Sequence, residues 1–181
     1  ARVLDEVSAM DDQARQQARK VTDDYRKTRQ RLDIAGLSEE LGEVMLRHRR
    51  LLPSQREFMR EAEQLQADIS EASLRPIQFE EELRNIRNSD AYIADLTAGL
   101  DAAELDAIRD DLTVLVENRT SLLEKAIQTD RDYLTALGEL DFARKQFSEA
   151  VRSYETFLSE RLLWVRSAGL LGVAALQGIP E

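Results

Sequence analysis

The sequence has 181 residues, of which 33% are charged, with a formal net charge of -10, seven glycines, three prolines and no cysteine. The acidic balance argues against binding to nucleic acid, which needs clustered Lys and Arg, and the lack of cysteine excludes disulfides, thiol catalysis and cysteine metal sites. Scarce glycine and proline, with no alternating runs of β-branched residues, predict an all-α fold.

The first predicted helix runs from Arg2 to about Asp33. An ion pair between Asp23 and Lys27, one turn apart, is expected on its outer face, and Gly36 is the glycine usual after a helix C-terminus. The residues expected to face a neighbouring helix recur at helical spacing, and they are Val3, Val7, Met10, Ala14, Ala18, Val21, Tyr25, Thr28 and Leu32.

A second helix is predicted after Ser38, which is a good N-cap. Pro53 interrupts this helix, and the following Ser54 and Glu57 match a capping box that starts a new one. The chain either kinks or reverses at Pro53. A kink is favoured because two residues leave little room for a reversal.

The third predicted helix runs from Ser54 to about Ile86 and contains Pro76. A proline in a helix interior costs about 3 kcal/mol, so a bend is predicted near Leu74–Pro76. After a turn at Asn88, Ser89 and Asp90, a short helix is expected from Ala91 to Leu96. The apolar face of the third predicted helix consists of Phe58, Ala62, Leu65, Ile69, Ala72, Phe79, Leu83 and Ile86.

A long helix is predicted from Asp101, which forms a second capping box with Glu104, to Arg166. Its apolar stripe covers about three positions per heptad, which suits a helix with two neighbours. Gly138 is its most flexible point. The main row is Leu105, Ile108, Leu112, Leu115, Arg119, Leu122, Ala126, Thr129, Tyr133, Ala136, Leu140, Ala143, Phe147, Ala150, Tyr154, Phe157, Arg161 and Trp164. A second row follows at Val116, Leu123, Leu137, Val151, Leu158 and Val165.

The lengths and apolar faces of these predicted helices indicate an elongated, antiparallel, coiled-coil-like bundle of three to four long helices over residues 1–166. Residues 167–181 are interpreted as an apolar tail, too short to cross a membrane. Because the long helix outruns its expected neighbours, exposed aromatic residues are expected between Phe147 and Trp164. The first residue, Ala1, suggests a processed protein or a piece of a larger one.

Few residues qualify as candidate sites. His48 is the only histidine and has neither a second metal ligand nor a triad partner, so a residue facing a neighbouring helix or solvent is favoured over a catalytic one. The basic cluster near Pro53 is interpreted as a solvated face, with anionic lipid or an acidic partner as the alternatives. That cluster consists of Arg47, Arg49, Arg50, Arg56 and Arg60.

The densest acidic run is Glu80, Glu81 and Glu82, which point to different sides of a helix and make a poor metal cage. An ion pair of Glu80 with Arg84 is expected. Arg119 and Arg161 lie on the apolar stripe, where a role in setting the helix register is favoured. No catalytic residue, cofactor site, metal site or Gly-rich phosphate loop is predicted.

Three stretches resemble the periplasmic region of large mechanosensitive channels of the MscS superfamily, the MscK-like group. They are LRPIQFEEELR at residues 74–84, YLTALGELD at 133–141 and YETFLSERLLWVRS at 154–167. In that family the periplasmic helices precede an array of membrane helices, so the end of this chain resembles the approach to the first of them. The pore lies further on and outside this chain.

The resemblance implies a non-catalytic periplasmic domain of an inner-membrane channel, with a structural, assembly or gating-coupling role in the osmotic response. Its partners would be the rest of the channel polypeptide and other subunits of a homo-oligomer, with no small-molecule substrate, and its membrane attachment would lie outside this chain. The alternative is a soluble coiled-coil scaffold or adaptor with no channel attached. Long apolar spans soon after Glu181 would distinguish the channel from the scaffold.

Overall fold

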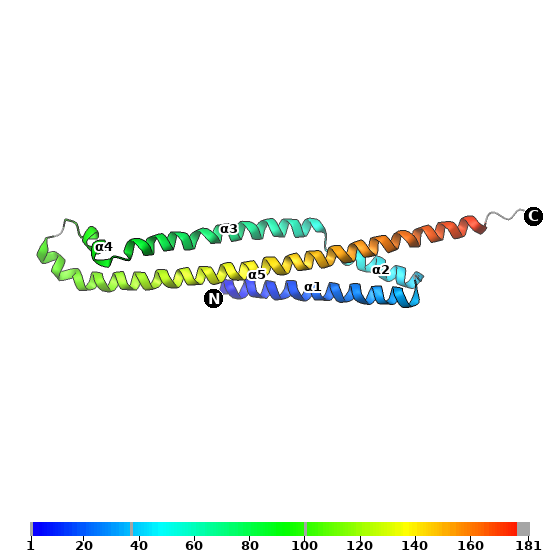
Figure 1. Cartoon of the computed structure of the whole chain (residues 1–181), viewed down its shortest axis with the longest axis horizontal. Coiled ribbons are helices and arrows are strands. Elements are labelled where there is room, and N and C mark those ends of the chain that lie inside the picture. The colour runs from blue at the N-terminus through cyan, green and yellow to red at the C-terminus, as the bar shows by residue number, and fades with distance from the viewer. Residues whose placement is uncertain (1, 37, 100, 177–181) are drawn as a thin grey trace, which may run out of the picture. The chain divides into compact units, whose positions relative to one another are not determined.

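The computed structural model describes residues 2–36, 38–99 and 101–176, without the side chains of Ser89, Ala102, Ala103, Leu105 and residues 164–176. Within these ranges every regular element is a helix (Figure 1), which confirms the predicted all-α fold. The helices are α1 (Arg2–Ala35), α2 (Glu39–Leu51), α3 (Gln55–Ile86), α4 (Ser89–Leu96) and α5 (Ala102–Leu176).

The predicted helix ends agree with local hydrogen bonding. After α1, Gly36 has a φ of 69°, in the left-handed region that favours glycine, and its amide donates to the carbonyl of Leu32 at 2.9 Å. Ser38 then caps α2, because its hydroxyl accepts from the amide of Leu41 at 3.2 Å. The turn between α1 and α2 is therefore specified by residues within it.

Both capping boxes form as predicted. The amide of Ser54 donates to the Glu57 carboxylate at 2.9 Å, and the amide of Glu57 donates back to the Ser54 hydroxyl at 3.4 Å. At the start of α5, Asp101 and Glu104 make the same reciprocal pair at 3.2 and 2.8 Å. Each box satisfies two amides that have no partner within the helix.

Pro53 separates two helices without reversing the chain. The helix α2 ends at Leu51 and α3 begins at Gln55. His48 of α2 contacts Tyr154 of α5, and further along the chain Phe58 of α3 contacts Phe147, which precedes Tyr154. Both helices are thus antiparallel to α5. The chain therefore does not reverse at Pro53, as favoured, but the predicted kink is wrong because the helix is interrupted there. Pro76, by contrast, lies inside the uninterrupted helix α3.

The chain divides into two units, and both contain part of α5. Unit 2 comprises Asp5–Glu63 and the chain from Glu139. Its helix α1 is parallel to α5, because Arg15 senses the charge of Glu139 while Tyr25 contacts Phe157. Consecutive long helices therefore alternate in direction. The core of this unit is formed by Leu41, Met45, Tyr154, Phe157, Leu158 and Leu162, with Val21, Tyr25, Leu32 and Leu52 packed against them.

Unit 1 comprises Gln64–Gly138 and the first turn of α1 to Leu4. Here α3 and α4 pack on the N-terminal half of α5. Ion pairs tie α3 to α5, from Arg75 to Asp130 at 3.6 Å and from Glu80 to Arg131 at 2.7 Å. The buried core of this unit contains Ile86, Ile93, Val116 and Leu123, flanked by Phe79, Leu83, Tyr92 and Leu112.

The expectation of exposed aromatic residues between Phe147 and Trp164 is wrong for the described part of that stretch. Tyr154 and Phe157 are buried and Phe147 is half-buried, because α1 and α2 both pack on α5 there. The helix α1 covers a part of α5 that the lengths of α2 and α3 alone would leave exposed. The side chain of Trp164 lies outside the described residues, as does that of Leu105.

The helix α5 continues to Leu176, beyond the predicted end at Arg166. Residues 167–176 are rich in leucine and alanine, which favour helix strongly enough to include two glycines. The side chains of this stretch, and all of residues 177–181, lie outside the described residues. Among the described residues no helix is both long enough and apolar enough to cross a membrane.

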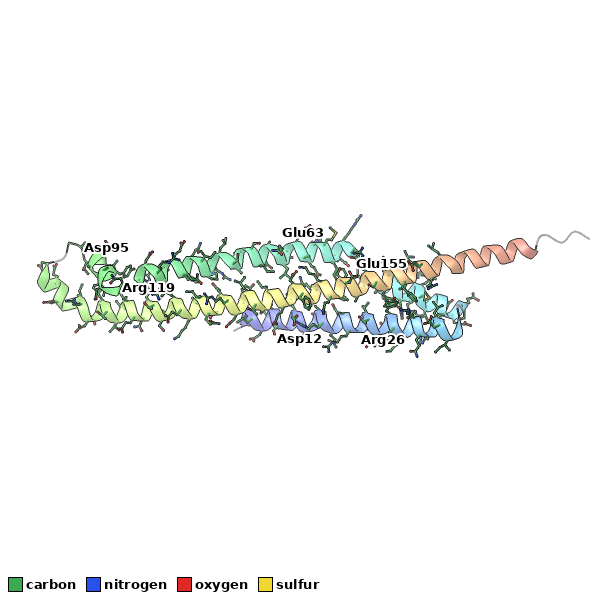
Figure 2. All side chains as sticks on the ribbon, viewed as in Figure 1. Asp12, Arg26, Glu63, Asp95, Arg119 and Glu155 are labelled. Atoms are coloured by element: carbon green, nitrogen blue, oxygen red, sulfur yellow. The ribbon has the colours of Figure 1, made fainter. Side chains whose placement is uncertain are left out.

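Charged side chains occupy the outer surfaces, as Asp12 and Arg26 do on α1 (Figure 2). The expected pair of Asp23 with Lys27 does not form. Asp23 instead accepts from Arg26 at 3.1 Å, three residues away. Both spacings place the partners on one side of a helix, so the sequence alone did not distinguish them.

Two glycines provide a matched test of backbone preference, since a Cβ added at Gly36 or at Gly138 would meet nothing within 4 Å. Gly138 lies inside α5, so Gly138→Ala should raise the free energy of unfolding by about 0.5–1 kcal/mol. Gly36→Ala should lower it by about 1 kcal/mol, because alanine resists the left-handed conformation. Chemical denaturation followed by circular dichroism measures the free energy of unfolding of both variants. A destabilising Gly138→Ala would contradict the prediction for Gly138.

Candidate functional site

A chain of three hydrogen-bonded side chains centred on Tyr154 lies in the core of unit 2. Its hydroxyl lies 2.8 Å from Oγ1 of Thr28 and 2.5 Å from Nδ1 of His48. Tyr154 is only 1% exposed, and its ring lies 5.6 Å from that of Tyr25. One residue from each of α1, α2 and α5 thus meets at a single point.

Helical periodicity places these three residues. Thr28, His48 and Tyr154 each occupy a position that the spacing of apolar residues assigns to a neighbouring helix. Met45, one turn before His48, and Leu158, one turn after Tyr154, are fully buried beside them. A polar group in such a setting needs a partner, because an unpaired one costs about 1–3 kcal/mol.

The three side chains are joined by hydrogen bonds through the hydroxyl of Tyr154. A phenol has one proton, so Tyr154 donates to one of its two partners and accepts from the other. Among the described residues no carboxylate hydrogen-bonds His48 to orient it as a triad would require. The preferred interpretation of His48, a residue facing a neighbouring helix, agrees with its half-buried position.

Burial raises the pKa of Tyr154 above the ordinary value of 10.0 because the phenolate loses its hydration. The hydrogen bond from Thr28 acts in the opposite direction and the nearby charge of Asp24 adds to the rise. The phenol therefore stays protonated, and this hydrogen-bonded chain stays intact, up to a higher pH than for an exposed tyrosine.

Two adjoining grooves lie beside the helix break at Pro53. Their volumes are about 330 and 310 Å³, and both are lined by Gln17, Pro53 and Phe147. One also reaches His48 and Tyr154, and the other reaches Arg144. At this break the chain passes from α2 to α3, and both grooves lie there next to α1.

The basic cluster around Pro53 faces solvent. All five arginines are exposed, and none forms an ion pair within the described part of the chain. Leu46, Leu51 and Met59, which are interspersed with them, are exposed as well. A solvated face remains the prediction for Arg47, Arg49, Arg50, Arg56 and Arg60.

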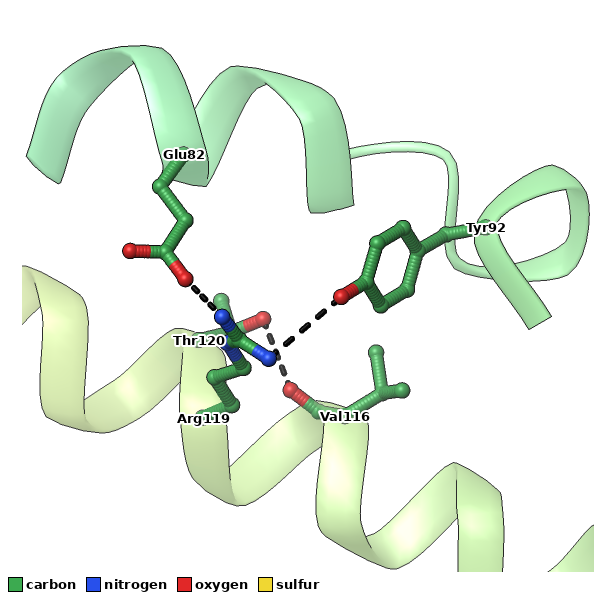
Figure 3. Close-up of polar contacts among 5 residues, drawn as sticks. All are labelled: Glu82, Tyr92, Val116, Arg119 and Thr120. Carbon is green, nitrogen blue, oxygen red and sulfur yellow. Dashed lines mark hydrogen bonds and ion pairs between the residues drawn. The ribbon is translucent and has the colours of Figure 1, made fainter. Parts of the chain in front are cut away.

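Two residues of the acidic run on α3 form ion pairs across unit 1. Glu80 pairs with Arg131 of α5 instead of with Arg84, so that expectation is wrong; a cross-helix partner competes with the one along the helix. Glu82 pairs with Arg119 of α5 (Figure 3). The guanidinium of Arg119 also donates to the hydroxyl of Tyr92 on α4, at 3.4 Å. Glu81 is exposed.

The two arginines of the apolar stripe differ in their surroundings. Arg119 links α5 to both α3 and α4, as a residue that fixes the register of neighbouring helices would. The guanidinium of Arg161 lies 5.8 Å from the centre of the Phe157 ring, a cation–π distance, and the side chain is exposed. No group of three or more His, Asp or Glu side chains placed to hold a metal occurs in the described ranges.

Comparison with protein-family models, with curated proteins and with solved structures gave no match to this chain.

Tyr154→Phe should lower the free energy of unfolding by about 1–3 kcal/mol, because Thr28 and His48 both lose their partner. Tyr25→Phe is the matched control. It removes a hydroxyl from the same core, but one that makes no hydrogen bond within the described structure, so its effect should stay below about 0.5 kcal/mol. Equal effects of the two changes in urea denaturation would contradict the role of Tyr154.

Stability should also fall at high pH in a way that depends on Tyr154. In the unfolded chain this phenol loses its proton near pH 10.0, while the folded protein holds it to higher pH. Above that value the unfolded state binds fewer protons, so raising the pH favours unfolding. The free energy of unfolding should drop more steeply above pH 10 in the wild type than in Tyr154→Phe; parallel curves would be the contrary result.

Proposed function

We propose that this chain is a non-catalytic helical domain of a large MscS-superfamily mechanosensitive channel, on the periplasmic side of the bacterial inner membrane. Its role there is structural, either in assembly or in coupling the state of the cell envelope to gating. The observation that carries the proposal is the resemblance of residues 154–167, together with those at 74–84 and 133–141, to the periplasmic region of MscK-like channels.

The contacts made by these stretches support the proposal. Two of them meet in unit 1, where the guanidinium of Arg75 lies 5.9 Å from the centre of the Tyr133 ring. The third contributes Tyr154, Phe157, Leu158 and Leu162 to the core of unit 2. Several residues of the three stretches therefore hold helices together, which suits a shared fold.

A helical domain can transmit displacement because a continuous helix resists bending except where its hydrogen bonding is weakened. Three positions here have that property. Pro53 separates α2 from α3, Pro76 lies within α3 without an amide proton to donate, and Gly138 lies in α5 with no side chain. These are the sites at which we propose that the domain bends under load.

The first test is the coding sequence beyond Glu181, which should encode long apolar spans soon afterwards. The second is deletion of residues 1–166 from the full-length channel. Single-channel conductance should be unchanged, because this chain does not contribute to the pore, whereas the tension needed for opening or the yield of assembled channel should change. If gating tension, assembly and partner binding were all unchanged, the proposed role would be wrong.

A soluble coiled-coil scaffold is the second candidate. The observation that favours it is the exposed apolar side chains on α5 in unit 1, at Ile108, Leu115 and Leu122, which suit binding to another helix. A scaffold needs no membrane span downstream, so the coding sequence beyond Glu181 separates the two candidates.

A further inference from the structure

The apolar stripe of α5 has two sides, and one of them is covered in both units. On this side Val116 and Leu123 of unit 1 are buried with Ile86 of α3. In unit 2 the same heptad position is occupied by Leu158, which is buried with Met45 of α2. The helices that run antiparallel to α5 therefore cover one side of the stripe along both units.

The other side of the stripe is covered along part of α5. Ile108, Leu115 and Leu122, here called the open row, are seven residues apart and 38%, 63% and 66% exposed. Residues at this spacing lie on one side of a helix. Continuing in steps of seven leads to Ala143 and Phe157, which are 0% and 9% exposed in unit 2. The cover on this side therefore ends between Leu122 and Ala143.

The helix that covers this side in unit 2 is α1. Tyr25 of α1 packs on Phe157, with ring centres 5.1 Å apart. Because α1 is parallel to α5, its N-terminal residues are the ones nearest the open row, and its first turn, to Leu4, belongs to unit 1. In that turn Val3 is 56% exposed, as expected at the end of a contact between two helices. The open row thus continues the surface of α5 to which α1 binds.

We propose that a helix in line with α1, formed by the polypeptide that precedes Ala1, covers the open row. The inference rests on the proposed function, in which this chain is one domain of a longer polypeptide. The preceding helix continues α1, runs parallel to α5 and extends their contact over the open row. All copies of the domain keep the same direction in a channel, since the contact is made within each polypeptide.

Continuity favours this occupant over a separate chain. On the side of the open row away from α3, Asp111 and Asn118 are polar and exposed, so the row offers a narrow contact of three apolar side chains. A separate helix has to lose its translational and rotational freedom for so small a contact. A helix joined to α1 is already held beside α5, which gives it a high effective concentration there.

The open row also determines what the preceding helix carries. Its apolar residues continue the spacing of three and four that the buried residues Val7 and Ala14 follow on α1. The row extends over two heptads, from Ile108 to Leu122, so about twenty residues are needed at an equal rise per residue. A proline in the interior of this helix is excluded, because it would break the contact.

The coding sequence before Ala1 is the first test. It should encode about twenty residues that continue α1 with this apolar spacing and without an interior proline. A glycine- and proline-rich stretch, charged residues at the positions facing the open row, or a coding sequence that begins at Ala1 would each overturn the proposal. The channel assignment would survive that result, because its own test is the presence of apolar spans after Glu181.

Thiol labelling tests the contact itself. Leu115→Cys is placed in the full-length polypeptide and in a version that begins at Ala1, and its reaction with a maleimide is followed by mass spectrometry of peptides. The rate should be at least about tenfold lower in the full-length protein, because the preceding helix buries the thiol. Leu74→Cys, at an exposed leucine on α3 of the same unit, is the matched control and should react equally fast in both proteins.

A third protein guards against misfolding of the shortened one. In it a Gly-Ser linker of equal length replaces the twenty or so residues before Ala1, and everything further upstream is kept. The fast reaction of Leu115→Cys should return, which separates cover by this segment from cover by anything before it. Slow labelling in the linker protein would overturn the proposal, and far-UV circular dichroism checks that all three proteins remain helical.

Two other labelling results would also overturn the proposal. If Leu115→Cys reacted as fast as Leu74→Cys in the full-length protein, the preceding segment would not cover the open row. If Leu115→Cys were equally slow in the full-length and shortened proteins, another subunit or another protein would lie there instead.

Discussion

Burial of the apolar stripe along α5 is the constraint on which the rest of the structure depends. A helix with such a broad apolar face is stable in water only when neighbouring helices cover that face. In unit 2 this cover is provided by α1 on one side and by α2 with the start of α3 on the other, around Tyr154 and Leu158. In unit 1 it is provided by α3 and α4. The difference between the units follows from how many helices each has available.

Within the covered stripe, polar residues add specificity that apolar ones lack. Apolar side chains pack in several registers, whereas a buried phenol has to meet its hydrogen-bond partners. Tyr154 meets Thr28 and His48 at once, which fixes α1, α2 and α5 relative to one another within unit 2. Arg119 has the same effect in unit 1 through Glu82 and Tyr92, at a more exposed position where an ion pair contributes less. Each unit thus has a polar residue that joins three helices.

The candidate functions proposed for this chain are mechanical or adhesive. Among the described residues, the polar side chains of Tyr154 and Arg119 join helices, and apolar and basic side chains are exposed on helix surfaces. A channel domain and a scaffold both use a surface of this type. They differ in what lies next to the chain, which is why the proposed function rests on the resemblance of particular stretches and not on geometry.

Periodicity and capping chemistry were enough to predict the helices, because both act within a few residues. Gly36, Ser38 and the two capping boxes were identified from sequence and have the expected hydrogen bonds. The choice of partner was decided only by tertiary structure. Nothing in the sequence indicated that Glu80 would bind Arg131 rather than Arg84, that α1 would cover Tyr154 and Phe157, or that Leu115 and Leu122 would stay exposed. Residues one turn apart are neighbours in any helix, whereas residues on separate helices become neighbours only once the helices have packed.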